Sequence, residues 1–452
     1  MKDIKDIKRI YFLGIGGIGM SALARYFNAR GVNVSGYDRT ETVLTKQLAS
    51  EGIAIHYEDH TGLIDKEAEL VVYTPAIPKD HQELNYLLQH AYTVVKRSDV
   101  LGMITNSSFN ICVAGTHGKT TTSTMIAHIL RDSGYGCNAF LGGIAANYNS
   151  NFWSHERNVC VVEADEYDRS FLKLSPDVAI ITAMDPDHLD IYGTAENVEQ
   201  AFIDFSARVK EGGLLLSKYG LKRGGELKAG NHTTYHLQEA AADVHAADIR
   251  VNSGSYTFHV VATEWTLTDV ALNMGGMHNI ENMVAAITVA KHLGIDDEKI
   301  RSAVRSFKGV KRRFEFIVKK DDQVFIDDYA HHPDELRALI TGAKKMFTGK
   351  KCTVIFQPHL FTRTRDFADG FAESLDLADE LVLLPIYPAR ELPIAGVTSQ
   401  MILDRMKNTN RQLIEKERLA EWVKANKTEL LITAGAGDID TLVEPIKNSL
   451  EN

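Results

Sequence analysis

Cysteine is scarce in this sequence of 452 residues, which holds four: Cys112, Cys137, Cys160 and Cys352. Their spacing shows no pairing of the kind that predicts a metal site. Three of the four lie within apolar, strand-like runs, which favours reduced thiols in a protein core and a cytoplasmic location. No apolar run reaches membrane-spanning length, and the charged N-terminus has no apolar signal region. We therefore expect a cytoplasmic protein with no stable membrane association.

Positive charge is in deficit as well. The sequence has 50 Lys and Arg residues against 60 Asp and Glu residues, which gives a formal net charge of −10. Nucleic acid is therefore not expected as a partner. Solenoid-type repeats and low-complexity tracts are absent too. The length predicts two or three globular domains, and the sequence carries no signal for an oligomeric state.

The sequence is organised around a glycine loop at residues 115–121. The apolar run Ile111–Ala114 predicts a buried strand before the loop, and a helical pattern begins at Lys119. Such a loop presents backbone N–H groups to an anion, and its lysine reaches the terminal phosphates of a nucleotide. Thr120 is placed to hold Mg²⁺ through its hydroxyl. The match to G-x-x-x-x-G-K-[ST] is incomplete, because Val113 occupies the position of the first glycine.

A second glycine-rich turn, Gly14-Ile-Gly16-Gly17-Ile-Gly19, follows the predicted strand Arg9–Leu13. The next strand ends in Asp38, and a further strand ends in the turn that begins at Thr74. These features make up the dinucleotide fingerprint, in which glycines and a helix N-terminus accept a pyrophosphate and a carboxylate accepts ribose hydroxyls. Because NAD and UDP-sugars present the same groups, the motif alone leaves both ligands open.

Acidic residues follow two further strands in the central part of the chain. The strand Asn158–Val162 is followed by Glu163-Ala-Asp165-Glu166, and the strand Val178–Ala183 by Asp185-Pro-Asp187-His188. Ligands of open α/β sheets bind at the carboxyl edge of the strands, where crowded carboxylates favour a cation among them. Mg²⁺ held by the loop threonine, a carboxylate and a further ligand meets this need. Because Mg²⁺ prefers oxygen, His188 fits a metal ligand and a phosphate partner equally well.

The pattern predicts three α/β domains. Residues 1–105 form a Rossmann-like domain, and residues 106–310 form a P-loop ATPase-type domain whose short strands between 230 and 275 lie antiparallel at one sheet edge. Residues 311–452 alternate strands and helices and predict a second Rossmann-like sheet. Its paired His331 and His332 lack a third His or Cys at zinc-like spacing, so no zinc site is expected.

Two pairs of polar residues have ordinary structural explanations. Asn279 and Asn282 share one face of a predicted helix, and from the residues alone a cap and a solvated amide are favoured over a contact to adenine. Arg312 and Arg313 join the central part of the chain to the last part, and a charge run of this kind is usually a solvated linker.

Together and in this order, the motifs resemble the Mur ligase family of peptidoglycan precursor synthesis over essentially the whole chain. The motifs that carry the resemblance are Gly115-Thr-His-Gly-Lys-Thr-Thr121, Glu163-Ala-Asp-Glu, Asp185-Pro-Asp-His188, His278-Asn-x-x-Asn282, Arg312-Arg313-Phe-Glu and Asp328-Tyr-Ala-His-His-Pro. The resemblance implies an ATP-dependent ligase that uses Mg²⁺ and joins L-alanine to the carboxylate of UDP-N-acetylmuramate through an acyl phosphate.

The family also implies a role for each matching residue. The UDP moiety would be bound by Gly14, Gly16, Gly17, Gly19, Asp38 and Thr74. The ATP phosphates would be bound by Gly115, Thr116, His117, Gly118, Lys119, Thr120, Thr121 and Arg313. Magnesium would be held by Thr120, Glu163 and His188. The adenine would contact Asn282 and the ATP ribose Asp328. The amino-acid and acyl-phosphate site would be lined by His331, His359 and Arg363.

Two departures from the family pattern bear on the substrate. Leu360 stands where some members carry an arginine, so a carboxylate contact would be made elsewhere. The region 199–204 has no lysine, whereas several later members of the family carry a carbamate-modified lysine there. The competing hypotheses are a ligase that adds a peptide, a nicotinamide-dependent oxidoreductase and a P-loop binding module without ligase chemistry. In the ligase, His331 is either the proton acceptor or one of the residues that position the amino acid.

Overall fold

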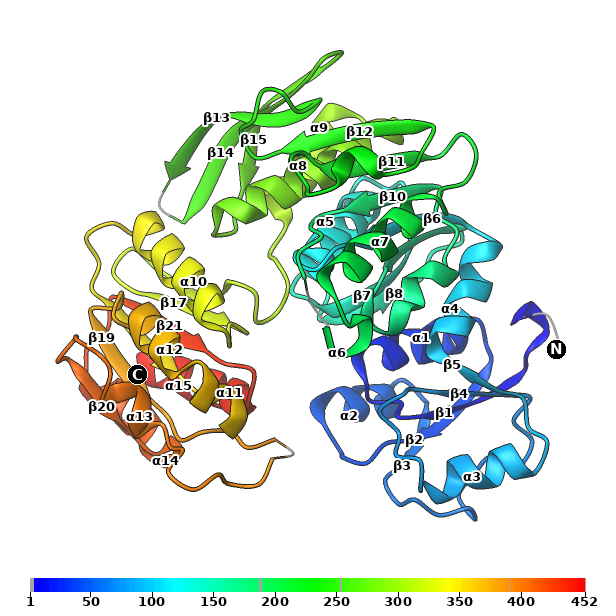
Figure 1. Cartoon of the computed structure of the whole chain (residues 1–452), viewed down its shortest axis with the longest axis horizontal. Coiled ribbons are helices and arrows are strands. Elements are labelled where there is room, and N and C mark those ends of the chain that lie inside the picture. Colours follow the sequence, from blue (N-terminus) through cyan, green and yellow to red (C-terminus); the bar gives the residue numbers. More distant parts are fainter. Residues whose placement is uncertain (1–3, 187–188, 253, 390, 452) are drawn as a thin grey trace. The chain divides into compact units, whose positions relative to one another are not determined.

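The computed structural model describes residues 4–186, 189–252, 254–389 and 391–451. Helices and strands form three sheets, which confirms the predicted α/β class. Figure 1 follows the chain from the N-terminal sheet, in blue, through the central sheet, in cyan and green, to the C-terminal sheet, in yellow to red. Within the described ranges no helix has the length and apolar character needed to cross a membrane.

Contacts divide the chain into two compact units. The first unit comprises Met1–Ala246, Val260–Leu267 and Glu281–Val304. The second comprises Ala247–His259, Thr268–Ile280 and Arg305–Asn452.

The N-terminal sheet has five parallel strands in the order β3-β2-β1-β4-β5. The strands are β1 (Arg9–Leu13), β2 (Asn33–Tyr37), β3 (Ala54–His56), β4 (Leu70–Tyr73) and β5 (Val94–Lys96). The helices are η1 (Ile4–Asp6), α1 (Ile18–Asn28), α2 (Val43–Ser50), α3 (Gln82–Gln89) and α4 (Arg97–Asn106). Helix α1 begins directly after the glycine turn, because Gly17 of the turn is its N-cap. Leu13 pairs with Tyr37 and with Tyr73, so the carboxyl ends of the three strands meet at one edge.

The central sheet has the order β12-β11-β10-β6-β9-β7-β8 in the first unit. The strands are β6 (Phe109–Ala114), β7 (Asn138–Ala145), β8 (Ser150–Trp153), β9 (Val159–Glu163), β10 (Val178–Ile181), β11 (Leu214–Lys218) and β12 (Asn231–His236). The helices are α5 (Lys119–Asp132), η2 (Tyr167–Lys173), α6 (Leu189–Tyr192), α7 (Ala195–Ser206), η3 (Gly224–Glu226), α8 (Met277–His292) and α9 (Asp297–Ser306). The hairpin of β7 and β8 was not predicted, and its edge strand β8 is antiparallel to β7.

Three further strands continue this sheet past β12: β13 (Val244–Asn252), β14 (Ser255–Ala262) and β15 (Thr266–Leu272). The predicted position of these strands at one sheet edge is confirmed. The antiparallel arrangement expected between 230 and 275 is wrong for the first of them, which joins β12 in parallel, with Tyr235 opposite Val244 and His236 opposite His245.

The C-terminal sheet has six strands in the order β16-β17-β21-β18-β19-β20. The strands are β16 (Glu315–Lys319), β17 (Val324–Asp328), β18 (Cys352–Phe356), β19 (Glu380–Leu383), β20 (Arg411–Leu413) and β21 (Leu430–Ala434). The helices are α10 (Pro333–Met346), α11 (Phe361–Asp366), α12 (Ala368–Leu375), α13 (Gln400–Leu403), α14 (Lys416–Ala425), η4 (Asp438–Leu442) and α15 (Val443–Glu451). Helices α11 and α12 are separated at Phe367, which has non-helical angles (φ −115°, ψ 16°).

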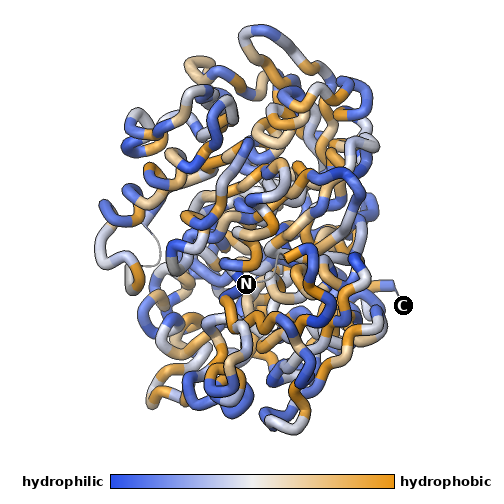
Figure 2. The backbone as a smooth tube through the Cα atoms, turned by 90° about the vertical axis from the view of Figure 1, so that its right-hand side faces the viewer, coloured by the Kyte–Doolittle hydropathy of each residue, from blue (hydrophilic) through white to orange (hydrophobic). Residues whose placement is uncertain are grey.

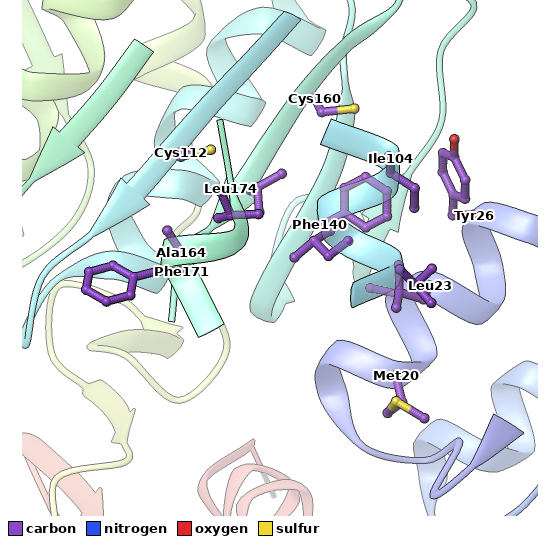
Figure 3. Packing of buried hydrophobic residues seen from close by; sticks show 14 of the residues in the cluster. Met20, Leu23, Tyr26, Ile104, Cys112, Phe140, Cys160, Ala164, Phe171 and Leu174 are labelled. Atoms are coloured by element: carbon purple, nitrogen blue, oxygen red, sulfur yellow. The ribbon is translucent and has the colours of Figure 1, made fainter. Parts of the chain in front are cut away.

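One hydrophobic core lies under both sheets of the first unit. Tyr26 of α1 packs with its ring centroid 5.2 Å from that of Phe140 on β7 and 6.1 Å from that of Phe152 on β8. Figure 3 shows Leu23 and Tyr26 beside Phe140 in this cluster. Hydrophobic and hydrophilic stretches alternate along the chain (Figure 2), and all four cysteines are buried and free, as predicted for core thiols. The glycine turn before α1 and the hairpin of the central sheet are therefore packed together.

Candidate functional site: a phosphate loop and a shared cavity

The glycine loop between β6 and α5 needs glycine at two positions. Gly118 is the N-cap of α5 and has φ +79°. Gly115 has φ +132°, and a Cβ there would lie 2.1 Å from Thr182 Oγ1. Helix α5 begins at Lys119, as predicted. The backbone thus makes a tight loop ahead of a helix N-terminus although the first glycine of the motif is missing.

Lys119 lies in the loop between two oxygen acceptors. Its Nζ donates to the Gly115 carbonyl at 2.8 Å and to Glu166 Oε1 at 2.7 Å. Glu166 is 1% exposed. Burial raises the pKa of the Glu166 carboxyl, and the Lys119 ammonium opposes that rise. Glu166 was not among the predicted site residues, although it stands in the acidic run that the sequence singled out.

Thr120 and Glu163 meet beside the lysine. The Thr120 hydroxyl donates to Glu163 Oε1 at 3.0 Å, and the Gly142 amide donates to Glu163 Oε2 at 2.9 Å. A Cβ at Gly142 would lie 2.2 Å from Glu163 Oε2, so a larger residue there would displace this carboxylate from its position. Burial raises the pKa of Glu163, with Lys119 acting in the opposite direction. A cation beside the carboxylate would relieve its desolvation.

These oxygen donors fit Mg²⁺. A threonine hydroxyl and a partly buried carboxylate are hard ligands of the type that Mg²⁺ takes, with phosphate oxygens and water completing the shell. In the described part of the chain no group of three or more His, Cys, Asp or Glu side chains is arranged to hold a metal ion. The predicted ligand His188 lies outside the described residues.

The remaining loop residues differ in exposure. Thr116 and Thr121 are each 8% exposed, and the Thr116 hydroxyl accepts from the Asp185 amide at 3.2 Å. The His117 side chain is 71% exposed, with Nε2 at 3.8 Å from Asp185 Oδ2. His117 is thus the member of the loop that is open to a ligand.

Asn282 of α8 lies against the loop. A Cβ built at Gly118 would be 3.0 Å from Asn282 Oδ1, and Asn282 is 8% exposed. Asn279 is also buried, and its Nδ2 donates to the Gly275 carbonyl at 2.6 Å. The explanation of Asn279 as a cap and Asn282 as a solvated amide is therefore wrong. The position of Asn282 beside the phosphate loop is compatible with a nucleotide contact.

The N-terminal glycine turn is held by Asp38. Asp38 Oδ2 accepts from the Gly16 amide at 2.7 Å and Oδ1 accepts from the Thr40 amide at 3.2 Å. Gly14 has φ +83°, and a Cβ there would lie 2.7 Å from Thr74 Cγ2. The turn, Asp38 and Thr74 are thus brought together as predicted, and the carboxylate shapes the loop in addition to any part in ligand binding.

A cavity of about 320 Å³ connects this turn to the phosphate-loop carboxylate. Its lining runs from Gly17 and Gly19 past Thr74 and Arg97 to Gly142 and Glu163. The N-terminal glycine turn and the carboxylate that accepts from Thr120 therefore face one space within the first unit.

Arg97 is the cation of this cavity, and sequence reasoning missed it. Its guanidinium packs on the turn, 2.6 Å from where a Cβ at Gly19 would be, and lies 3.8 Å from Asp165 Oδ2. The available signal was its place as the first residue after β5, at the carboxyl edge of the N-terminal sheet.

In the second unit, the side chains of Asp328 and Arg312 form hydrogen bonds with backbone groups. Asp328 accepts from the Phe314 amide at 2.6 Å and from the Ala330 amide at 2.7 Å, and burial raises the pKa of its carboxyl to about 6. Arg312 donates to the Gly435 carbonyl and lies 3.6 Å from Asp327 Oδ2. A solvated linker therefore does not describe Arg312. Arg313 lies with its guanidinium carbon 5.3 Å from the Tyr329 ring centroid.

Two histidines and an arginine gather at the carboxyl edge of the C-terminal sheet. The His331 and His359 rings are 6.3 Å apart between centroids, and Arg363 Nη1 lies 3.4 Å from His359 Nδ1. Burial lowers the pKa of His331, which favours the neutral imidazole. Leu360, which lies between His359 and Arg363 in the sequence, has φ +69°. This conformation is uncommon for a leucine, and such conformations cluster at functional sites. The sequence predicted this grouping of His331, His359 and Arg363.

The three-sheet α/β fold, the Gly-Lys-Thr loop and the carboxylate beside the loop threonine define a nucleotide-dependent enzyme with a second ligand pocket. Family models match three successive stretches of the chain: "Mur ligase family, catalytic domain" at residues 9–108, "Mur ligase middle domain" at 113–290, and "Mur ligase, glutamate ligase domain" at 312–439. The chain belongs to the Mur ligase family, whose members are ATP-dependent ligases.

Relatives match over the full length. UDP-N-acetylmuramate–L-alanine ligase of Parabacteroides distasonis is 50% identical, over 99% of this chain and 98% of its own length. The enzyme of that name from Christiangramia forsetii is 47% identical, over 100% and 99%. Among solved structures, UDP-N-acetylmuramate-alanine ligase of Thermotoga maritima has a TM-score of 0.84 at 29% identity, covering 98% of this chain and 99% of that one. A murein peptide ligase of Psychrobacter arcticus, with a TM-score of 0.68 at 22% identity over 98% and 99%, shares the fold.

Proposed function

We propose that this protein joins L-alanine to the carboxylate of UDP-N-acetylmuramate, with ATP converted to ADP and phosphate, in the cytoplasmic synthesis of peptidoglycan precursors. The observation that carries the proposal is the cavity that the N-terminal glycine turn shares with Glu163 of the phosphate-loop site. Full-length identity of 50% to a UDP-N-acetylmuramate–L-alanine ligase supports the same substrates. No nucleic acid or membrane partner forms part of the proposal.

The proposed reaction has two steps. A carboxylate is a poor acyl donor because oxide is a poor leaving group. In the first step a carboxylate oxygen of the muramate bonds to the γ-phosphorus of ATP, the bridging P–O bond breaks and ADP leaves. In the second step the amine of alanine attacks the acyl carbon, phosphate leaves with the bonding pair and the nitrogen loses a proton.

Cationic side chains make the first step feasible, because both reactants are anions. Lys119 and Arg313 are proposed to screen this repulsion and to stabilise the equatorial oxygens of the transferring phosphoryl group. Thr120, Glu163 and His188 are proposed to hold Mg²⁺, which supplies further neutralisation of phosphate charge when bound. Gly14, Gly16, Gly17, Gly19, Asp38 and Thr74 are proposed to hold the UDP part of the substrate.

The second step needs an acceptor for the amine proton. His331 is proposed for this role, since burial keeps its imidazole neutral. His359 and Arg363 are proposed to position the amino acid, Asn282 to contact the adenine and Asp328 the ATP ribose. We assign these roles to three domains, 1–105, 106–310 and 311–452, a division close to the three family matches.

Phosphate release tests the proposal. The protein is supplied with ATP, Mg²⁺ and UDP-N-acetylmuramate, and single amino acids are compared with a tripeptide. We expect release that depends on both UDP-N-acetylmuramate and L-alanine. Preference for the tripeptide would instead assign the chain to the peptide-adding type, and ATP turnover that needs no amine would contradict ligation. A thermal shift with NAD but not with UDP would favour the oxidoreductase.

A further inference from the structure

Lys119 is already engaged by protein oxygens before any phosphate is considered. Two of the three ammonium protons point to Gly115 O and Glu166 Oε1, at 2.8 and 2.7 Å. The ammonium is only 14% exposed. A nucleotide phosphate that binds in the loop therefore meets a lysine whose charge is neutralised by a buried carboxylate.

Glu166 is fixed in place but only half satisfied. Its backbone carbonyl accepts from the Tyr192 hydroxyl at 2.6 Å and from the Arg169 amide at 2.9 Å. Its Oε2 is buried and has no hydrogen-bond partner among the described residues. A buried carboxylate with one unpaired oxygen is a costly arrangement, and its attraction to Lys119 is strong because little water screens it.

We propose that Glu166 is a positioning residue that holds the Lys119 ammonium over the phosphate loop and competes with nucleotide phosphates for it. Nucleotide binding then includes a transfer of the lysine from the carboxylate to the phosphate. The contact keeps the lysine ordered at the loop. It also weakens nucleotide binding, because the lysine is available to a phosphate only during the fraction of time that the ion pair is open. The inference rests on the proposed function only in that the loop binds a nucleotide.

A competing carboxylate and a merely structural one predict opposite changes in affinity. If Glu166 only braces the loop, its neutralisation loosens the site and ADP binds equally well or less tightly. If Glu166 competes for Lys119, neutralisation frees the lysine and ADP binds more tightly, while turnover falls because the ammonium is no longer aligned. An increase in affinity joined to a decrease in kcat is the signature of competition.

The test is isothermal titration of Mg²⁺ and ADP into the full chain and its variants. Glu166→Gln keeps the shape of the side chain and is expected to lower the Kd of ADP by about tenfold or more, since an ion pair closed nine-tenths of the time or more has that effect. Asp165→Asn removes a neighbouring charge that does not touch Lys119. Asp177→Asn breaks a Lys–carboxylate bond of the same 2.7 Å length, to Lys210, outside the loop.

Tighter ADP binding by Glu166→Gln, with at most twofold change in the two control variants, supports the inference. Unchanged or weaker ADP binding by Glu166→Gln overturns the inference. Equally tight ADP binding by Asp165→Asn also overturns it, because the loss of any nearby negative charge would then explain the result. If Glu166→Gln does not fold, Glu166→Asp is used, because its shorter side chain places the carboxylate farther from Lys119. Tighter ADP binding by this variant supports the inference, and unchanged or weaker ADP binding overturns it. Ligase activity of the wild-type chain is measured separately, so the proposed ligase function and the proposed role of Glu166 can fail independently.

Discussion

Single glycines decide whether the phosphate loop can form. Gly115 combines a left-handed φ of +132° with a neighbour, Thr182 Oγ1, that would be 2.1 Å from any Cβ. Gly134, at the end of α5, has φ +78° and nothing within 4 Å of a Cβ. The two positions separate the effect of backbone strain from the effect of a clash inside the loop.

Gly115→Ala is expected to lower kcat/KM for ATP by about 100-fold, because a misplacement of about 1 Å in a site costs roughly that factor. Gly134→Ala is the matched control: it adds left-handed strain of about 1–2 kcal/mol and is expected to leave kcat/KM unchanged. Steady-state phosphate release measures the rates and urea denaturation measures the strain. Equal losses of activity in the two variants would contradict the account of the loop.

Asp327 is a buried carboxyl whose protonation is tied to folding. It is 1% exposed, accepts from the Thr433 hydroxyl at 2.6 Å, and burial raises its pKa to about 7. The folded pKa lies above the unfolded value, so between about pH 4 and 7 the folded state holds a proton that the unfolded state has lost. The free energy of unfolding should therefore fall as the pH rises through this window.

Asp327→Asn is expected to flatten that slope by as much as about 1.4 kcal/mol per pH unit. The amide keeps an acceptor for Thr433 and does not titrate. Asp328, with a pKa raised to about 6, leaves a residual slope of the same sign. Urea unfolding at intervals from pH 4.5 to 9 measures the effect. If the free energy of unfolding of Asp327→Asn changed with pH as steeply as that of the wild type below pH 7, the role of Asp327 would be refuted. Above pH 8 the two pH dependences should coincide.

At the scale of elements, the β7–β8 hairpin links the two ligand motifs. Asn151 of β8 is fully buried; it accepts from Arg25 Nη1 at 2.6 Å and donates to Ile18 O at 2.5 Å and Ser21 Oγ at 2.9 Å, all on α1. On β7, the Gly142 amide holds Glu163. The hairpin therefore sets the spacing between the N-terminal glycine turn and the phosphate-loop carboxylate.

Asn151→Ala is expected to lower the free energy of unfolding by about 1–3 kcal/mol, because it leaves buried polar groups of α1 unpaired. It should also raise KM for UDP-N-acetylmuramate by about tenfold, or 1.4 kcal/mol, with a smaller change in KM for ATP. Asn138→Ala is the control, since Asn138 on β7 is as buried and donates to Arg157 O and Val159 O away from the cavity. A similar rise in KM from both variants would show that lost stability alone is responsible.

Elements that are local in sequence could be predicted, and elements defined by distant partners could not. The unit of β6, loop and α5 was readable because strand, glycines and lysine are contiguous. The hairpin of β7 and β8 was missed, since its role depends on Asn151 meeting α1 across 130 residues. The break at Phe367 between α11 and α12 likewise has no glycine or proline to mark it.

Site residues divide in the same way. Lys119, Thr120 and Glu163 were predicted from motifs. In the structure Thr120 donates to Glu163, and the Lys119 charge lowers the pKa of the Glu163 carboxyl against the effect of burial. Arg97 and Glu166 were missed because their importance comes from what they face, a Gly19 surface and a lysine ammonium. Asp38 was identified by its spacing, yet its bond to the Gly16 amide has no counterpart in the sequence pattern.

For the whole molecule, the two compact units carry different parts of the proposed chemistry. The glycine turn, the cavity and the Thr120–Glu163 pair belong to the first unit, and the His331, His359 and Arg363 group belongs to the second. The three tryptophans are divided as well, with Trp153 and Trp265 in the first unit and Trp422 in the second. Fluorescence can therefore report the unfolding of each unit separately.

UDP-N-acetylmuramate is expected to stabilise the first unit selectively, because every residue proposed to hold its UDP part lies there. At 100 times its Kd a ligand adds about 2.7 kcal/mol to the state that binds it, which corresponds to a shift of roughly 5–10 °C in Tm for a unit of this size. Thermal melts of Trp422→Phe, whose remaining tryptophans report the first unit, should show that shift. Melts of the Trp153→Phe/Trp265→Phe variant, which reports the second unit, should move less. UDP alone should give a smaller shift of the same pattern, since it lacks the contacts that the muramate part would add. A shift confined to the Trp422 signal would place the sugar nucleotide in the second unit and undo the assignment of the glycine turn.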